Sequence, residues 1–208
     1  MVQDPERLAW AAMTALQVPL DYARQGRNLS WAALAGAKKM QVLRHHPLHD
    51  VVDEEHQTRF YYHAHPLPGD EHEHGHFHVF RDTVPGRFHH LAALSLDVQG
   101  RPRRWFCTNQ WVTGETWAPA CDVQRWISSF EVSARGKMAP VARWLTALFY
   151  LDAPRLMGLI LERDRYLDAW GPHRTQTWQN RQLHVLCSLN IDLPERIQSL
   201  TLEEGEPI

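Results

Sequence analysis

Histidine occupies every second position of residues 72–78, where His74, His76 and His78 follow one another at a spacing of two. A β-strand turns successive side chains to opposite faces, so these three imidazoles would share one face and Gly75 and Phe77 the other. Residues 61–65 repeat the pattern with His63 and His65. Neutral imidazole is the commonest metal ligand in proteins, so the spacing predicts a transition-metal site.

A turn-like segment, residues 66–70, separates the two histidine stretches, because Pro66, Pro68 and Gly69 all fall within it. The two stretches are therefore predicted to form a β-hairpin. Residues two apart on one strand lie roughly 6–7 Å apart on the same face, and cross-strand partners lie nearer still. The candidate ligands are His63, His65, His76 and His78, with His74 as a substitute and Asp70, Glu71 or Glu73 as a carboxylate donor.

The number and type of ligands would set the chemistry of such a site. Two imidazoles and one carboxylate form the facial triad of non-heme Fe(II) oxygenases, which leaves positions open for substrate and O₂. Three imidazoles with a water suit zinc and hydrolysis. Four imidazoles with no open position suit metal carriage or storage.

The preferred hypothesis is a non-heme metal-dependent oxidoreductase that acts on a small organic substrate, with Fe(II) as the first choice of metal and copper or zinc as alternatives. A non-enzymatic metal carrier or store, a zinc-dependent hydrolase and a metal-free module whose histidines titrate near pH 6.5 are the rival hypotheses. No residue is assigned as catalytic. The chain contains no GxGxxG, phosphate loop, GxSxG or HExxH motif.

Other reactive side chains are interpreted more conservatively. His89 and His90 would point to opposite faces of a strand, so at most one joins the site, and His90 is the candidate. The alternation of that strand groups His90 with Leu94 and Leu96. Cys107 is interpreted as a buried core thiol, with a nucleophile as the alternative.

Composition restricts the classes of partner. The 208 residues include 22 Lys and Arg against 24 Asp and Glu, a balance that gives no electrostatic footprint for nucleic acid or an anionic membrane. The three cysteines form no CxxC pair, which fits a reducing compartment. With no recognisable signal peptide or spanning apolar run, the sequence predicts a cytoplasmic protein whose partner is a small molecule, and it sets no oligomeric state.

Period-two patterns predict strands at 58–65, 75–81, 89–97 and 103–113, joined by turn-rich segments. The sequence thus predicts an α+β class, with a small antiparallel sheet or partial barrel at about residues 58–113. Residues 48–56 are interpreted as a loop or irregular segment, with a short helix as the alternative. The whole chain, 1–208, is expected to form one domain, with helices in 1–46 and in 120–200.

Helix signals surround the sheet. Asp4 and Pro5 open a first helix, and Ser30 opens a second that runs toward Arg44. In the C-terminal part, helices are expected around Trp126, over 141–151, from 152 to about 170, over 177–189, and in a short final segment from Asp192.

Overall fold

The computed structural model describes residues 3–64 and 72–203. Its six strands form one open antiparallel sheet in the order β1-β2-β3-β4-β5-β6, with helices on both sides of it in the sequence. The predicted α+β class is therefore confirmed, and the sheet is not closed into a barrel. The extent of the domain, residues 1–208, stays a prediction.

The elements follow one another along the chain with short connections. The strands are β1 His46–Asp53, β2 Thr58–His63, β3 Glu73–Val84, β4 Arg87–Asp97, β5 Pro102–Thr108 and β6 Val185–Asn190. The α-helices are α1 Pro5–Arg24, α2 Leu29–Ala33, α3 Gln110–Thr113, α4 Ala120–Ser128, α5 Ala139–Asp168, α6 Arg174–Gln179 and α7 Leu193–Glu203. Two 3₁₀ turns, η1 Gly136–Met138 and η2 Gly171–His173, precede α5 and α6.

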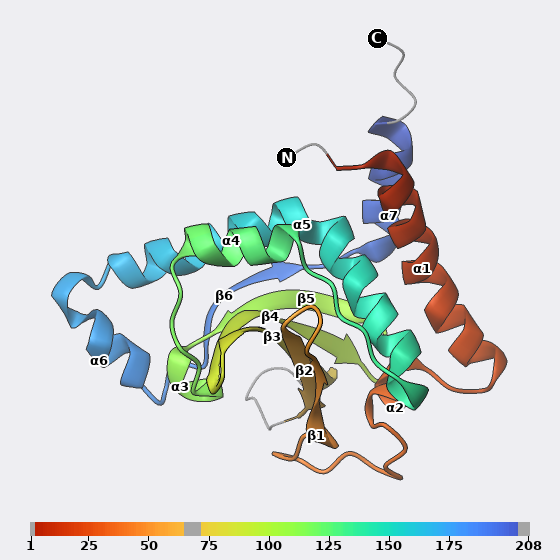
Figure 1. Cartoon of the computed structure of the whole chain (residues 1–208), viewed down its shortest axis with the longest axis horizontal. Helices are drawn as coiled ribbons and strands as arrows, with labels where there is room; N and C mark the ends of the chain where they lie inside the picture. Colours follow the sequence, from red (N-terminus) through yellow and green to blue (C-terminus); the bar gives the residue numbers. More distant parts are fainter. Residues whose placement is uncertain (1–2, 65–71, 204–208) are drawn as a thin grey trace.

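Helices α4 and α5 cover one face of the sheet, with β5 and β6 nearest to α5 and β1 farthest from it (Figure 1). Trp105 of β5 packs edge-to-face on Phe149 of α5, with ring centroids 4.9 Å apart, and its indole Nε1–H donates to Asp152 at 2.7 Å. All three side chains are buried. The face toward α5 is thus the hydrophobic core, and the opposite face of β2–β5 carries most of the histidines discussed below.

Helix α5 and the turn before it, Gly136–Asp168, are long and apolar enough to cross a membrane by length and composition. Of the most apolar 18-residue window, 67% is buried inside the fold. Burial of this kind is typical of the central helix of a packed domain, in which an all-round apolar surface meets a sheet and other helices.

Two strands replace segments that were predicted otherwise. Residues 46–53 form β1, where the sequence predicted a loop over 48–56, because an edge strand tolerates polar and exposed side chains on its open side. Residues 185–190 form β6 in place of a helix over 177–189. Leu186 and Leu189 have the spacing of three that fits a helix, but pairing with β5 forms a strand in which they lie on opposite faces.

Two helical predictions and one strand prediction also differ from the structure. The second helix ends at Ala33, because Ala35 and Gly36 adopt left-handed backbone conformations with φ of 54° and 97°. The helices predicted over 141–151 and from 152 are one helix, α5, with Pro154 inside it. Residues 110–113 leave the predicted strand as α3, capped by the side chain of Asn109.

Two β-bulges change which side chains face the histidine side of the sheet. Glu73 pairs with Asp97 and Gly75 with Leu96, so His74 is an extra residue in β3. Likewise Val79 pairs with Ala92 and Phe80 with His90, so Leu91 is an extra residue in β4. Each extra residue reverses the alternation beyond it.

The first bulge requires glycine at position 75. A Cβ at Gly75 would lie 2.7 Å from the carbonyl oxygen of His63 and 2.8 Å from the ring of Tyr62. Both neighbours are held in the sheet, since Tyr62 is fully buried and His63 pairs with His76. The backbones of β2 and β3 can therefore approach each other this closely only because residue 75 has no side chain.

We expect Gly75→Ala to lower the free energy of unfolding by about 1–3 kcal/mol, because the methyl group overpacks a fixed site. Urea denaturation of the metal-free protein measures this. Gly158→Ala in α5 is the matched control, since nothing lies within 4 Å of its Cβ position and alanine favours a helix by about 0.5–1 kcal/mol. Equal effects of the two substitutions on the free energy of unfolding would contradict the requirement for glycine at position 75.

A carboxylate-centred hydrogen-bond group ties the β1–β2 turn to the segment before α5. Asp53 accepts the Nδ1–H of His56 at 2.7 Å and the backbone N–H of Ser133 at 2.6 Å. The bond to Asp53 raises the pKa of His56. Burial alone would raise the pKa of Asp53, but the bonds from His56 and Ser133 outweigh it, so the pKa of Asp53 is lowered.

This pair makes stability depend on pH in a defined direction. Because the folded pKa of His56 is raised, its contribution is present below the unfolded value of 6.5 and is lost as pH rises through the folded value. We expect the difference in unfolding free energy between wild type and His56→Gln to be larger at pH 5.5 than at pH 8.5. Equal differences at the two pH values, measured by urea denaturation, would contradict this account.

Candidate metal centre

Strand register brings three imidazoles together on the face of the sheet opposite α5. His63 of β2 lies directly across from His76 of β3, and Tyr61 lies across from His78. Directly paired residues share a face, and His78 follows His76 at a spacing of two. One ring nitrogen from each of His63, His76 and His78 lies within 4.8 Å of the others. The three side chains form the imidazole cluster.

The closest contact within the imidazole cluster joins His63 Nε2 and His76 Nε2, which are 2.9 Å apart. Nδ1 of His76 lies 2.5 Å from Oε1 of Glu73. An ionised carboxylate only accepts, so Nδ1 of His76 carries the proton and its Nε2 presents a lone pair in the neutral ring. A carboxylate behind a histidine is the arrangement that orients metal ligands and raises their basicity.

His78 is held from behind in a comparable way by another imidazole. Its Nδ1 lies 3.0 Å from Nε2 of His90, and Nδ1 of His90 lies 3.5 Å from the Thr108 hydroxyl. The backbone N–H of His90 donates to the carboxylate of Glu115. The orientation of the His78 ring is therefore set by β4 and by the segment after α3.

Burial controls the charges next to the imidazole cluster. His76 and His78 are 0% exposed, and burial lowers the pKa of His90 to about 3, so that ring is neutral. Burial also raises the pKa of Glu115 to about 8, although the His90 backbone bond and Arg163 oppose the shift. Neutral imidazoles, which carry lone pairs, are the forms that bind metals.

Aromatic side chains surround the imidazole cluster. The ring centroid of Tyr61 lies 5.3 Å from that of His63 and 5.2 Å from that of His78. The ring of Phe106 lies 5.3 Å from that of His76. Both aromatic residues are buried, so on these sides the imidazole cluster has apolar neighbours and little access for bulk water.

The imidazole cluster is close to, but not in, the geometry of a bound ion. Imidazole nitrogens lie about 2.0–2.1 Å from zinc, so two of them on one ion are at most about 4.2 Å apart. The farthest pair would then need to approach by no more than about 0.6 Å. Small side-chain rotations suffice for this.

Three of the predicted metal ligands lie together, a fourth lies on the other face of the sheet, and the predicted carboxylate lies behind one of the rings. His63, His76 and His78 form the imidazole cluster, while His74 lies on the other side, with Nδ1 2.9 Å from the hydroxyl of Tyr62. The expectation that His74 shares the face of His76 is wrong, because His74 is the extra residue of the first bulge. Glu73 contacts His76 through Nδ1, behind the ring.

The predicted ligand His65 and the alternatives Asp70 and Glu71 lie outside the described residues. Cys107 is buried on the core side, opposite Cys187 of β6, and the hydrogen bond with the Cys187 thiol together with burial raises its pKa. A raised pKa opposes a nucleophilic thiolate. The interpretation of Cys107 as a core thiol therefore fits the structure.

His90 and not His89 contacts the imidazole cluster, as predicted, but the predicted grouping of His90 with Leu94 and Leu96 on one face is wrong. The second bulge puts His90 on the face of His78 instead. Glu115, which anchors the backbone of His90, ends a polar run at residues 108–115. From the sequence, the polar side chains of this run were interpreted either as groups that orient ligands or a substrate, or as a strand end and turn.

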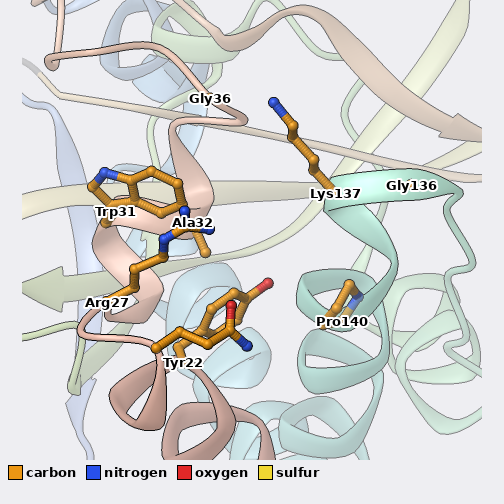
Figure 2. Close-up of a pocket in the computed structure, with 9 residues that line it drawn as sticks. Tyr22, Arg27, Trp31, Ala32, Gly36, Gly136, Lys137 and Pro140 are labelled. Atoms are coloured by element: carbon orange, nitrogen blue, oxygen red, sulfur yellow. The ribbon is translucent and has the colours of Figure 1, made fainter.

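Two surface pockets lie away from the imidazole cluster. A pocket of about 320 Å³ lies between α2 and the start of α5, where Tyr22, Arg27, Trp31 and Lys137 surround it (Figure 2). No imidazole, thiol or carboxylate is among the residues that line it, so this pocket is not a metal site. A larger pocket of about 890 Å³ runs along α1 beside the β4–β5 turn.

Comparison with known proteins gives a family without an assigned activity. No curated protein and no solved structure matches the chain significantly. A family model described as a domain of unknown function, DUF6969, matches residues 9–191. This range includes every strand of the described sheet and all three residues of the imidazole cluster. The chain belongs to the DUF6969 family.

Proposed function

We propose that the protein is a metalloprotein that holds one transition-metal ion with His63, His76 and His78. The observation that carries this proposal is the convergence of one ring nitrogen from each residue within 4.8 Å, at a place where two of the rings are fully buried. Three neutral nitrogen ligands are a set used by zinc, copper, iron and nickel.

The reaction class that we propose is a non-heme metal-dependent oxidation of a small organic substrate, with Fe(II) as the first choice of metal. Three protein ligands leave coordination positions for substrate and O₂. The apolar shell of Tyr61 and Phe106 supports this class, because it shields reactive intermediates from water. The free thiols of Cys107, Cys121 and Cys187 are consistent with a cytoplasmic location, which is part of the proposal.

Zinc-dependent hydrolysis is the second candidate, favoured by one observation. The ligands are three imidazoles with a carboxylate behind one of them, because Glu73 contacts Nδ1 of His76. Three histidines with a bound water and a carboxylate behind a ligand are the features of catalytic zinc sites. The native metal separates the candidates, since redox-inactive zinc cannot support the oxidation.

A metal store or carrier has less support from the geometry. Exchangeable storage requires accessible ligands, and His76 and His78 are 0% exposed. One buried ion per chain is expected from the imidazole cluster, whereas a store would take up several.

We expect protein purified without a metal-affinity step to contain about one transition-metal ion per chain, by elemental analysis. His63→Ala, His76→Ala and His78→Ala should each weaken the affinity by more than the roughly 10–100-fold that loss of an outer partner costs. His49→Ala is the matched control, because His49 is exposed on β1. Absence of metal even after reconstitution, or full occupancy in all three variants, would refute the proposal.

We expect Glu73→Gln to lower metal affinity by roughly 10–100-fold while keeping one ion per chain at saturation. The neutral amide no longer raises the basicity of His76 through Nδ1. Competition with a chelator of known affinity measures the change. If Glu73 were itself a ligand, its loss should change the ligand set as well, which X-ray absorption spectroscopy would detect.

A further inference from the structure

A transverse row of paired residues crosses four strands on the face of the imidazole cluster. His63 pairs with His76, His76 with Ser95, and Ser95 with Arg104. Directly paired residues share a face with Cβ atoms about 4.5–5.5 Å apart. Ser95 therefore lies between two of the imidazole ligands and an arginine.

The hydroxyl of Ser95 is buried without a hydrogen bond. Ser95 is 0% exposed, and its hydroxyl has no hydrogen-bond partner in the described part of the chain. Burying a hydroxyl that makes no hydrogen bond is unfavourable, so most buried polar groups in native proteins have a partner. An alanine would fill the same place without this cost, and the hydroxyl therefore points to a bound group.

Arg104 brings a cation to the same place. A terminal nitrogen of its guanidinium lies 3.5 Å from Oε2 of Glu73, and its central carbon lies 5.1 Å from the ring centroid of Phe106. Its side chain is 23% exposed, so this end of the row can be reached from solvent. Guanidinium groups present a planar fork of donors that matches the two oxygens of a carboxylate.

The charges of the site also favour an anion. His63, His76 and His78 bring no charge when they bind a metal as neutral ligands, so a divalent ion keeps its two positive charges. The carboxylate of Glu73 and the guanidinium of Arg104 offset each other. A buried positive site of this kind stabilises a negative ligand.

We propose that the substrate is a small carboxylic acid, whose carboxylate is bound by Arg104 and the Ser95 hydroxyl while the rest of the molecule reaches the metal. The proposal rests on the metal site proposed above and names the substrate class of that site. Ser95 lies one strand spacing, about 4.8 Å, from His76, and this distance suits a molecule of a few carbon atoms.

The test uses the full chain loaded with Co²⁺, whose visible absorption reports the ligands of the ion, after unbound Co²⁺ has been removed. Lactate is the probe, and lactamide is its neutral match. We expect lactate to change the spectrum with an affinity at least tenfold higher than that of lactamide. Arg104→Gln should weaken lactate binding by roughly 10–100-fold, as loss of a charged hydrogen bond does, and Ser95→Ala by roughly 3–10-fold.

Cobalt affinity provides the readout that separates substrate binding from a structural role. If Arg104 only positions Glu73, Arg104→Gln weakens cobalt binding and leaves the affinity for lactate unchanged, which would overturn the proposal. Arg103→Gln is the matched control, because Arg103 is the adjacent arginine of β5 on the alternate face. Ser95→Ala should not lower the melting temperature of the metal-free protein, since the hydroxyl makes no bond within it.

The possible failures are distinguishable. Absence of cobalt binding refutes the metal site and the substrate class with it. Cobalt binding with equal affinities for lactate and lactamide, or with lactate affinity unchanged in both variants, refutes the substrate class alone. Inorganic phosphate that binds as tightly as lactate would overturn the assignment of a carboxylate.

Discussion

The direct pairing of His63 with His76 across β2 and β3 is the constraint on which the whole site depends. A shift of one residue in this register would turn His63 toward the core and separate it from both partners on β3. The register is held from the core side, where the neighbouring pair Tyr62 and Phe77 is fully buried. Hydrophobic packing on one face of the sheet thus determines the chemistry on the other.

Two irregularities in the sheet complete the site. The extra residue His74 leaves Glu73 behind His76, and the extra residue Leu91 places His90 behind His78. Each imidazole that β3 contributes to the cluster therefore has its own supporting side chain. Bulges are found next to functional sites because they redirect single side chains without disturbing the rest of a sheet.

The sequence was informative where regular alternation holds and misleading where it is interrupted. Alternation alone predicts that His76 and His78 share a face, and the hairpin prediction adds His63. Alternation cannot locate a bulge, because an extra residue leaves composition and local propensity unchanged. The face of His74, and the grouping of His90 with Leu94 and Leu96, were therefore predicted wrongly. The strand β6 was missed for a different reason, since Leu186 and Leu189 have helical spacing and only the pairing with β5, a contact distant in sequence, makes this segment a strand.

The position of β6 has a consequence for how the chain folds. Thr108 of β5 pairs with Val185 of β6, and all of α3 to α6 lies between them in the sequence. Contacts this distant in sequence form slowly, because a long loop must close before they are made. During synthesis the outer edge of β5 consequently lacks its partner until residues 185–190 have emerged, and an unpaired edge is a site of aggregation.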